Sequence, residues 1–202
     1  MVDFKNRELR DLTIAWLVLS LVFTKIVSLR TGTDIYLGFF YSLIIVGITF
    51  IFHELAHRSV ARKCGAFAEF RLSTMGIIMA LLLAVMSGGR FIFAAPGAVY
   101  ISALKIMRWK GEFSNLRNQD YGLISAAGPL ANLAFAAIFI LLNQIYYSVF
   151  FTTAAYINVF IALFNLLPFP PFDGSKVMRW DRKTWIFLFV VALIGWMGFY
   201  FF

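Results

Sequence analysis

The amino-acid sequence predicts an all-α polytopic membrane protein, and two observations carry this prediction. First, 61% of the 202 residues are hydrophobic and only 14% are charged, whereas soluble domains average about 25% charged residues. Second, several uncharged stretches approach the roughly 20 residues that a helix needs to cross a bilayer. A soluble globule of this size could not hide so much apolar surface. We therefore expect one domain, residues 1–202, that sits in the lipid bilayer.

The uncharged stretches indicate about five to six transmembrane helices. Lys25 interrupts the first stretch near its end, where the ammonium group can reach the lipid headgroups. The second stretch continues as a helix into the segment HELAH at residues 53–57. The longest stretch is long enough for two crossings, with a turn near Asn143. The predicted spans are residues 12–29, 35–52, two crossings within 121–172, and 184–202.

The segment between the second and third crossings is less regular. AEFRLSTMG (68–76) and RFIFAAPGAVYI (90–101) carry β-branched and aromatic residues with Gly or Pro punctuation, which favours strands. Bare strand edges cannot face lipid. We therefore expect a re-entrant or β-hairpin-like element near residues 67–104, packed against helices, or else a pair of short helices. In either case the chain enters and leaves the membrane on the same side, so the direction of the later spans is unchanged.

The distribution of Lys and Arg predicts the orientation. With the N-terminus inside, 15 of the 18 basic residues fall in inner segments, as the positive-inside rule requires. We expect a multi-pass cell-membrane protein whose N-terminus and active-site side are cytoplasmic. A net charge of +8 is often a sign of nucleic-acid binding. Here the basic residues form short tracts between apolar runs, as in the loops of a membrane protein, so we expect no nucleic-acid partner. The 15 are Lys5, Arg7, Arg10, Arg58, Arg62, Lys63, Arg71, Lys105, Arg108, Lys110, Arg117, Lys176, Arg179, Arg182 and Lys183.

The HELAH segment predicts a metal site with hydrolytic chemistry. His53 and His57, the two histidines of the chain, are four residues apart and share one helix face. Both imidazoles can bind one Zn²⁺ at about 2.0–2.1 Å. Glu54 is turned aside by about 100°, from where it can reach a water on the metal. Zinc lowers the pKa of such a water to about 7, and Glu54 would pass the proton to a leaving amine.

Two histidines leave a catalytic zinc one protein ligand short, and Asp173 is the favoured third ligand. It is the first charged residue after 52 uncharged ones. It follows Pro168, Pro170 and Pro171, which end a helix. Irregular backbone at membrane depth is tolerated only where it is buried or lines a wet cavity. The preceding span runs from outside to inside, so Asp173 lies in the same membrane half as the histidines.

Asn132 and Asn165 are candidate substrate-binding residues in that same half. Each amide could hydrogen-bond a substrate backbone or an oxyanion, and each could equally hold helices together. Both alternatives stay open for Asn132, which follows Gly128 in GPLAN. Substrate binding is favoured for Asn165, because the neighbouring prolines leave backbone groups that an amide can serve.

HELAH on a membrane span, followed much later by NLLPFPPFDG (165–174), resembles the site-2 protease family of intramembrane zinc metalloproteases. The stretch Gly128–Asn132 fits a further motif of that family, and the resemblance covers residues 35–173. It implies regulated intramembrane proteolysis of other transmembrane proteins, often after a first cut elsewhere. It also implies that one zinc ion is bound by His53, His57 and Asp173, that Glu54 is catalytic, and that Asn165 lies near the bound peptide.

The resemblance also carries an expectation about the substrate. A substrate helix would enter from lipid and unwind, because a helical peptide bond is already hydrogen-bonded and shielded. The unwound stretch could then pair with an exposed strand edge within residues 67–101. The chain leaves no room for the PDZ or CBS domains of many members, so it resembles the compact prokaryotic ones, archaeal members included.

Three alternatives stay open. Another kind of HExxH membrane protease would use Glu69 or Glu112 as third ligand, since Cys64 lies about 10 Å beyond His57 along a helix. A catalytically silent membrane-helix-binding partner or chaperone could use the same groove. Glu54 argues against this alternative, because a protein that only binds helices does not need a general base beside a metal. A metal transporter would need several ionisable residues at the midplane.

Overall fold

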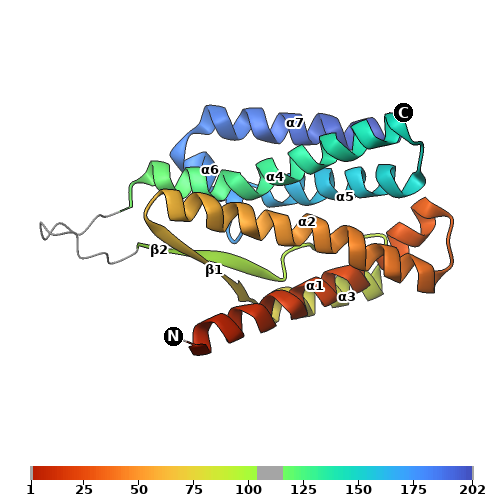
Figure 1. Ribbon diagram of the computed structural model, residues 1–202, viewed down its shortest axis with the longest axis horizontal. Helices are drawn as coiled ribbons and strands as arrows, with labels where there is room; N and C mark the ends of the chain where they lie inside the picture. Colours follow the sequence, from red (N-terminus) through yellow and green to blue (C-terminus); the bar gives the residue numbers. More distant parts are fainter. Residues whose placement is uncertain (1, 104–115, 202) are drawn as a thin grey trace, which may run out of the picture.

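The structure is a computed structural model that describes residues 2–103 and 116–201. Within these ranges it contains seven helices and one two-stranded sheet (Figure 1). The prediction of an all-α polytopic membrane protein is confirmed. In chain order the elements are α1 (Val2–Thr31), α2 (Ile35–Lys63), β1 (Ala66–Leu72), α3 (Thr74–Met86), β2 (Gly97–Ala103), α4 (Asn118–Ile145), α5 (Val149–Asn165), α6 (Asp173–Trp180) and α7 (Arg182–Phe201).

Four of the described helices are long and apolar enough to cross a membrane, namely Asn6–Thr31 of α1, all of α2 and α4, and Arg182–Phe199 of α7. The apolar helix α5 has 17 residues, or about 25 Å at 1.5 Å per residue, and packs against α4. If α5 is counted with these four, the described residues hold five apolar helices, which is within the predicted range. The two termini accordingly lie at opposite ends of the long axis (Figure 1).

The turn between α4 and α5 lies where the sequence predicts it. The side-chain oxygen of Asn143 accepts a hydrogen bond from the Ser148 N–H at 2.9 Å. The Ser148 hydroxyl oxygen accepts from the Phe150 N–H at 3.3 Å and so caps α5. The uncharged stretch from 121 to 172 is therefore two antiparallel helices, as expected.

Polar contacts fix α2 against α1. The Trp16 indole N–H donates to the Leu43 carbonyl at 2.9 Å, and the Ser42 hydroxyl donates to the Ser20 carbonyl at 2.7 Å. Such contacts matter in lipid, where no hydrophobic driving force brings helices together. Because α2 also packs against α4 and α5, its HELAH segment lies inside the bundle.

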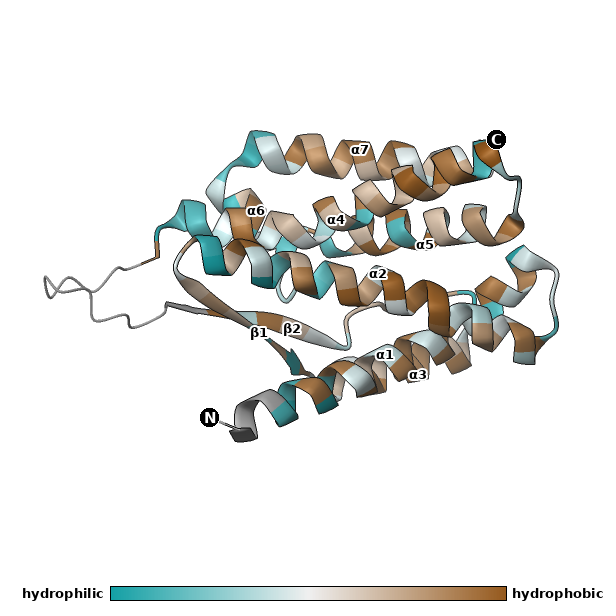
Figure 2. Ribbon diagram, in the orientation of Figure 1, coloured by the Kyte–Doolittle hydropathy of each residue, from teal (hydrophilic) through white to brown (hydrophobic). Residues whose placement is uncertain are grey.

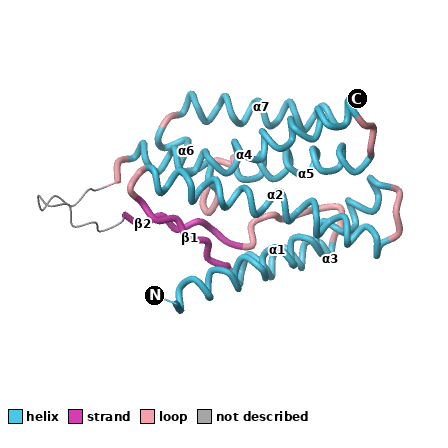
Figure 3. Tube along the Cα trace, in the orientation of Figure 1, coloured by secondary structure: helices cyan, strands magenta, loops and turns pink. Residues whose placement is uncertain are grey.

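Residues 66–103 form a strand, a helix and a strand, so the structure combines the two alternatives that the sequence left open (Figure 3). β1 and β2 pair antiparallel, with Phe70 opposite Val99. Helix α3 occupies the apolar stretch between them, and the Ser73 hydroxyl caps it by accepting the Gly76 N–H at 3.1 Å. The element was thus correctly placed but only partly strand-like.

The strand expectation for RFIFAAP (90–96) was wrong. These residues form no strand, and β2 begins only at Gly97. Pro96 has no N–H to contribute to a ladder, but its carbonyl accepts the Ser73 N–H at 2.8 Å. The segment therefore serves as the return from α3 to the sheet.

The outer edge of β1 is covered by acidic side chains of α1. The Phe70 N–H donates to the Glu8 carboxylate at 3.4 Å, and the Leu72 N–H donates to the Asp11 carboxylate at 3.3 Å. Arg58 of α2 also pairs with Glu8. Because β1 is occupied on both sides, the free edge of this sheet is that of β2.

Hydrophilic residues gather at one end of the molecule, where α1, α4 and α7 begin (Figure 2). The C-terminal turns of α2, which carry Arg58, Arg62 and Lys63, lie at the same end (Figure 1). The segments that were predicted to share one membrane side therefore lie together. Lys105, Arg108 and Lys110 fall outside the described residues.

Candidate metal centre

The two histidines of HELAH project from one face of α2 into the bundle. His53 and His57 are only 4% and 1% exposed, and their Nε2 atoms lie 3.0 Å apart. One helical turn separates the residues, so the backbone of α2 alone suffices to bring both rings to one point.

Asp173 reaches this point from a distant part of the chain. Helix α5 ends at Asn165, and α6 begins at Asp173 after the proline segment. A Cβ on Gly174 would lie 2.1 Å from the Leu166 carbonyl oxygen, so only glycine lets the chain pass so close. The Asp173 Oδ2 atom then lies 3.0 Å from His57 Nε2 and 3.5 Å from His53 Nε2.

These three side chains are positioned to bind a metal ion. Ligands of a tetrahedral zinc with bonds of about 2.0–2.1 Å lie about 3.3 Å apart, close to the separations of the two imidazole nitrogens and the carboxylate oxygen. Two imidazoles and one carboxylate also suit a catalytic site with an open position. Within residues 2–103 and 116–201, no other group of three His, Cys, Asp or Glu side chains is so placed.

The other ring nitrogen of each histidine has a partner on α4. His57 Nδ1 lies 2.7 Å from the Ile124 carbonyl oxygen, and His53 Nδ1 lies 2.6 Å from Asn132 Oδ1. A backbone carbonyl can only accept, so His57 Nδ1 carries a proton, and in the neutral imidazole Nε2 then keeps its lone pair for a metal. Such outer contacts orient metal-binding histidines and set their tautomer.

Gly128 lets α4 approach the two rings. A Cβ at this position would lie 2.3 Å from His57 Nε2 and 2.6 Å from His53 Nε2. The space beside the ring nitrogens is therefore a cradle that any larger residue would fill. This observation and the donor set together show that the site fits a metal ion.

A small cavity adjoins the metal centre. It has a volume of about 30 Å³ and is lined by Glu54, His53 and Asn165, with Gly97 at the start of β2. This volume is enough for a water molecule. Glu54 and Asn165, which belong to different helices, therefore face one space beside a candidate ligand.

Asn132 lies deeper in the bundle. Its side chain is fully buried. Its oxygen contacts His53, and its nitrogen donates to the Thr49 carbonyl at 3.0 Å and to the Asn158 side-chain oxygen at 3.2 Å. This geometry favours the contact between helices over substrate binding. Asn158 and Thr49 were not anticipated, although an asparagine inside an apolar span is itself a signal.

Two of the other candidate ligands, Glu69 and Cys64, do not join the metal centre. Glu69 of β1 pairs with Arg71 at 3.1 Å, and Cys64 lies just beyond the end of α2. Neither belongs to the metal-binding group. Glu112, the remaining alternative, falls outside the described residues.

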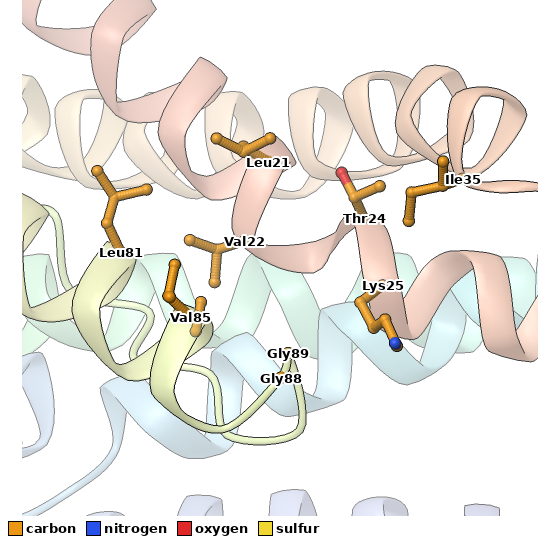
Figure 4. A pocket seen from close by; sticks show the side chains of 10 residues that line it. Leu21, Val22, Thr24, Lys25, Ile35, Leu81, Val85, Gly88 and Gly89 are labelled. Carbon is orange, nitrogen blue, oxygen red and sulfur yellow. The ribbon is translucent and has the colours of Figure 1, made fainter.

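A wider cleft of about 460 Å³ lies away from this centre, between α1 and α3 (Figure 4). Its lining is apolar except for Thr24 and Lys25. Gly89 packs against the stem of Lys25, where a Cβ would lie 2.6 Å from the Lys25 Cβ. None of the candidate ligands lines this cleft.

Comparison with known proteins bears on this geometry. The model of the family described as "Peptidase family M50" matches residues 41–149 and 142–181 of the chain. The chain belongs to this family. The resemblance to the site-2 protease family is thereby confirmed, and the matched region of this M50 protein contains all three candidate ligands.

Two relatives of the M50 protein are informative. "Putative zinc metalloprotease MJ0611" of Methanocaldococcus jannaschii is 41% identical over 199 residues, which cover 96% of this chain and 94% of the relative. "Putative zinc metalloprotease YwhC" of Bacillus subtilis is 32% identical over 161 residues, covering 69% of this chain and 68% of the relative. No solved structure matches the chain.

Replacing Gly128 by alanine should abolish tight metal binding. The added methyl group would occupy the space beside both Nε2 atoms. Alanine has a higher helix propensity than glycine, so the substitution would not itself weaken α4. We expect metal affinity to fall at least roughly tenfold, the scale on which disturbing a ligand's surroundings acts. Titration with Co²⁺ or Zn²⁺ in detergent measures it. Gly198→Ala, at a position with open space, is the control, and unchanged affinity in folded Gly128→Ala would contradict the geometry.

Proposed function

We propose that this protein is a zinc-dependent intramembrane endopeptidase that hydrolyses peptide bonds in or near transmembrane segments of other proteins. The observation that carries the proposal is the convergence of His53, His57 and Asp173 at one buried point inside a bundle of membrane-crossing helices. The names of the two relatives support zinc as the metal and proteolysis as the reaction. The membrane location of the site supports a substrate that is itself in the membrane.

The chemistry divides between the metal and the chain. Zinc, when bound, supplies a Lewis acid that activates water and polarises the scissile carbonyl. His53, His57 and Asp173 would hold it. Glu54 lines the cavity beside His53, so its carboxylate can take a proton from a water there and give it to the leaving amine. Glu54 is therefore the proposed general base and acid.

Asn165 is the proposed contact to the substrate backbone. Its amide nitrogen donates to the Ile161 carbonyl at 3.0 Å, which fixes the side chain at the end of α5. The same residue lines the cavity that Glu54 also lines. An amide held in this way can hydrogen-bond a peptide that lies across the cavity, or its developing oxyanion.

The free edge of β2 is the proposed docking site for the unwound substrate. Antiparallel pairs alternate between groups that face the partner strand and groups that face away. Since the Phe70 N–H turns toward α1, the opposite residue Val99 also presents its N–H and carbonyl outward. Lys176 contacts that carbonyl at 3.3 Å. Because Gly97 of β2 lines the catalytic cavity, a strand added at this edge would reach Glu54.

The orientation and the domain organisation also belong to the proposal. The basic C-terminal turns of α2 and the hydrophilic starts of α1, α4 and α7 share one end of the molecule. The positive-inside rule favours the cytoplasm for that end, and α6 with Asp173 lies near it (Figure 1). We infer a single membrane domain over residues 1–202 that cuts near the cytoplasmic face.

Glu54→Gln should abolish cleavage and keep the metal. The amide has the same shape but cannot accept the proton, so the rate should fall by about 10²–10⁴. The measurement uses detergent-purified protein and a labelled transmembrane peptide with helix-breaking Gly and Pro residues, with zinc content determined in parallel. Glu69→Gln, which lies outside the metal centre, is the matched control.

Two results of that experiment would contradict the proposal, the first on the role of Glu54 and the second on proteolysis itself. A Glu54→Gln protein that still cuts would refute the base assignment. Wild-type protein that co-purifies with the peptide and leaves it intact, with or without a zinc chelator, would favour a helix-holding partner over a protease.

Val99→Pro should block docking of the substrate strand. Proline removes the outward N–H of Val99 but leaves the ladder to β1, whose hydrogen bonds come from the flanking residues. We expect peptide affinity and cleavage to fall while zinc content stays unchanged. Val99→Ala, which shortens the side chain and keeps the N–H, is the control. Equal cleavage by both variants would rule out this edge as the docking site.

A further inference from the structure

A buried chain of hydrogen bonds runs from His53 to α5. It passes through Asn132 of α4 to Asn158 of α5 and returns to Thr49 of α2. The three polar residues beyond the histidine are all 0% exposed. None of the three lines the small cavity beside Glu54, and their side chains contact one another across three helices.

Backbone carbonyls fix the direction of this chain. The Ala154 carbonyl can only accept, so the nitrogen of the Asn158 amide faces it at 2.9 Å. The Asn158 oxygen then faces Asn132 and accepts its N–H at 3.2 Å. The remaining Asn132 hydrogen goes to the Thr49 carbonyl at 3.0 Å. The Asn132 oxygen must therefore face His53, whose Nδ1 donates to it at 2.6 Å.

The hydroxyl of Thr49 completes the arrangement. It donates to the Ile45 carbonyl at 2.7 Å, so its oxygen is an acceptor for the second Asn158 N–H at 2.9 Å. Each N–H of the two amides thus has an acceptor. Turning either amide over would place N–H against N–H and carbonyl against carbonyl among fully buried side chains, where unpaired polar groups are costly.

We propose that Asn158 is a positioning residue for the metal centre. Through Asn132 it holds His53 in the tautomer whose Nε2 lone pair faces the metal. His57 needs no such residue, because a backbone carbonyl fixes its tautomer. The partner of His53 is instead a side-chain amide, whose orientation depends on its two acceptors, the Thr49 carbonyl and the Asn158 side chain. The inference rests on the proposed function in one respect, namely that His53 is a metal ligand.

Asn158→Leu tests the proposal, because leucine has a similar volume and no hydrogen-bonding group. We expect the dissociation constant for zinc to rise about tenfold, the lower end of the effect of losing a direct outer partner. Competition with a chelator of known affinity, well below the unfolding temperature, measures it on folded protein. Thr153→Val is the matched control, since Thr153 is a buried α5 residue whose hydroxyl has no partner among the described residues.

A second pair of variants separates positioning from helix packing. Thr49→Ser keeps the hydroxyl that accepts from Asn158 and should keep wild-type zinc affinity, whereas Thr49→Val should weaken zinc binding like Asn158→Leu. The double variant Thr49→Val with Asn158→Leu should bind zinc no more weakly than Asn158→Leu alone, because both changes break one chain. This pair also decides the matter if Asn158→Leu does not fold.

His53→Ala is the reference that separates the two levels of the proposal. If His53→Ala loses zinc while Asn158→Leu and Thr49→Val keep wild-type affinity, the positioning role is overturned and the proposed metal centre stands. If His53→Ala binds zinc as well as wild type, His53 is not a ligand, and both the positioning role and the proposed metal centre are overturned. Lowered thermal stability of Asn158→Leu with unchanged zinc affinity would also overturn the positioning role.

Discussion

The meeting of the Asp173 carboxylate with the imidazoles of α2 is the contact on which the rest of the structure depends. It joins the start of α6 to α2 across 116 residues of sequence, with the Asp173 Oδ2 atom 3.0 Å from His57 Nε2. Inside a membrane, such a cluster of ionisable groups persists only where the groups pair with one another or with a metal. The proline segment and Gly174 bring Asp173 to the histidines, and Gly128 leaves room beside their ring nitrogens.

The surroundings of the cluster satisfy its polar atoms without exposing it to lipid. The Ile124 carbonyl serves His57, and the amide chain from Asn132 serves His53. The sheet follows the same rule, because α1 carboxylates cover the edge of β1. Only the edge of β2 is left for another chain, and it begins beside the cavity of Glu54. Under the proposed function, this architecture would bring water and peptide to one place.

The features that the sequence predicted are those that depend on local spacing or on the absence of charge. Hydropathy predicted the spans and the turn at Asn143. The four-residue spacing placed His53 and His57 on one helix face. Asp173 was noticed because it is the first charged residue after a long uncharged run. The cover of β1 by Glu8 could not be foreseen, because it joins segments 62 residues apart. Asn158 was likewise overlooked, since its role exists only once three helices meet.

Zinc K-edge X-ray absorption on the purified protein tests the central claim most directly. The account predicts a shell of nitrogen and oxygen at about 2.0–2.1 Å with no sulfur at about 2.3 Å. It also predicts that Asp173→Ala loses the metal or one oxygen from that shell, while Glu69→Ala gives the wild-type spectrum. An Asp173→Ala protein that holds zinc with an unchanged spectrum would contradict the account.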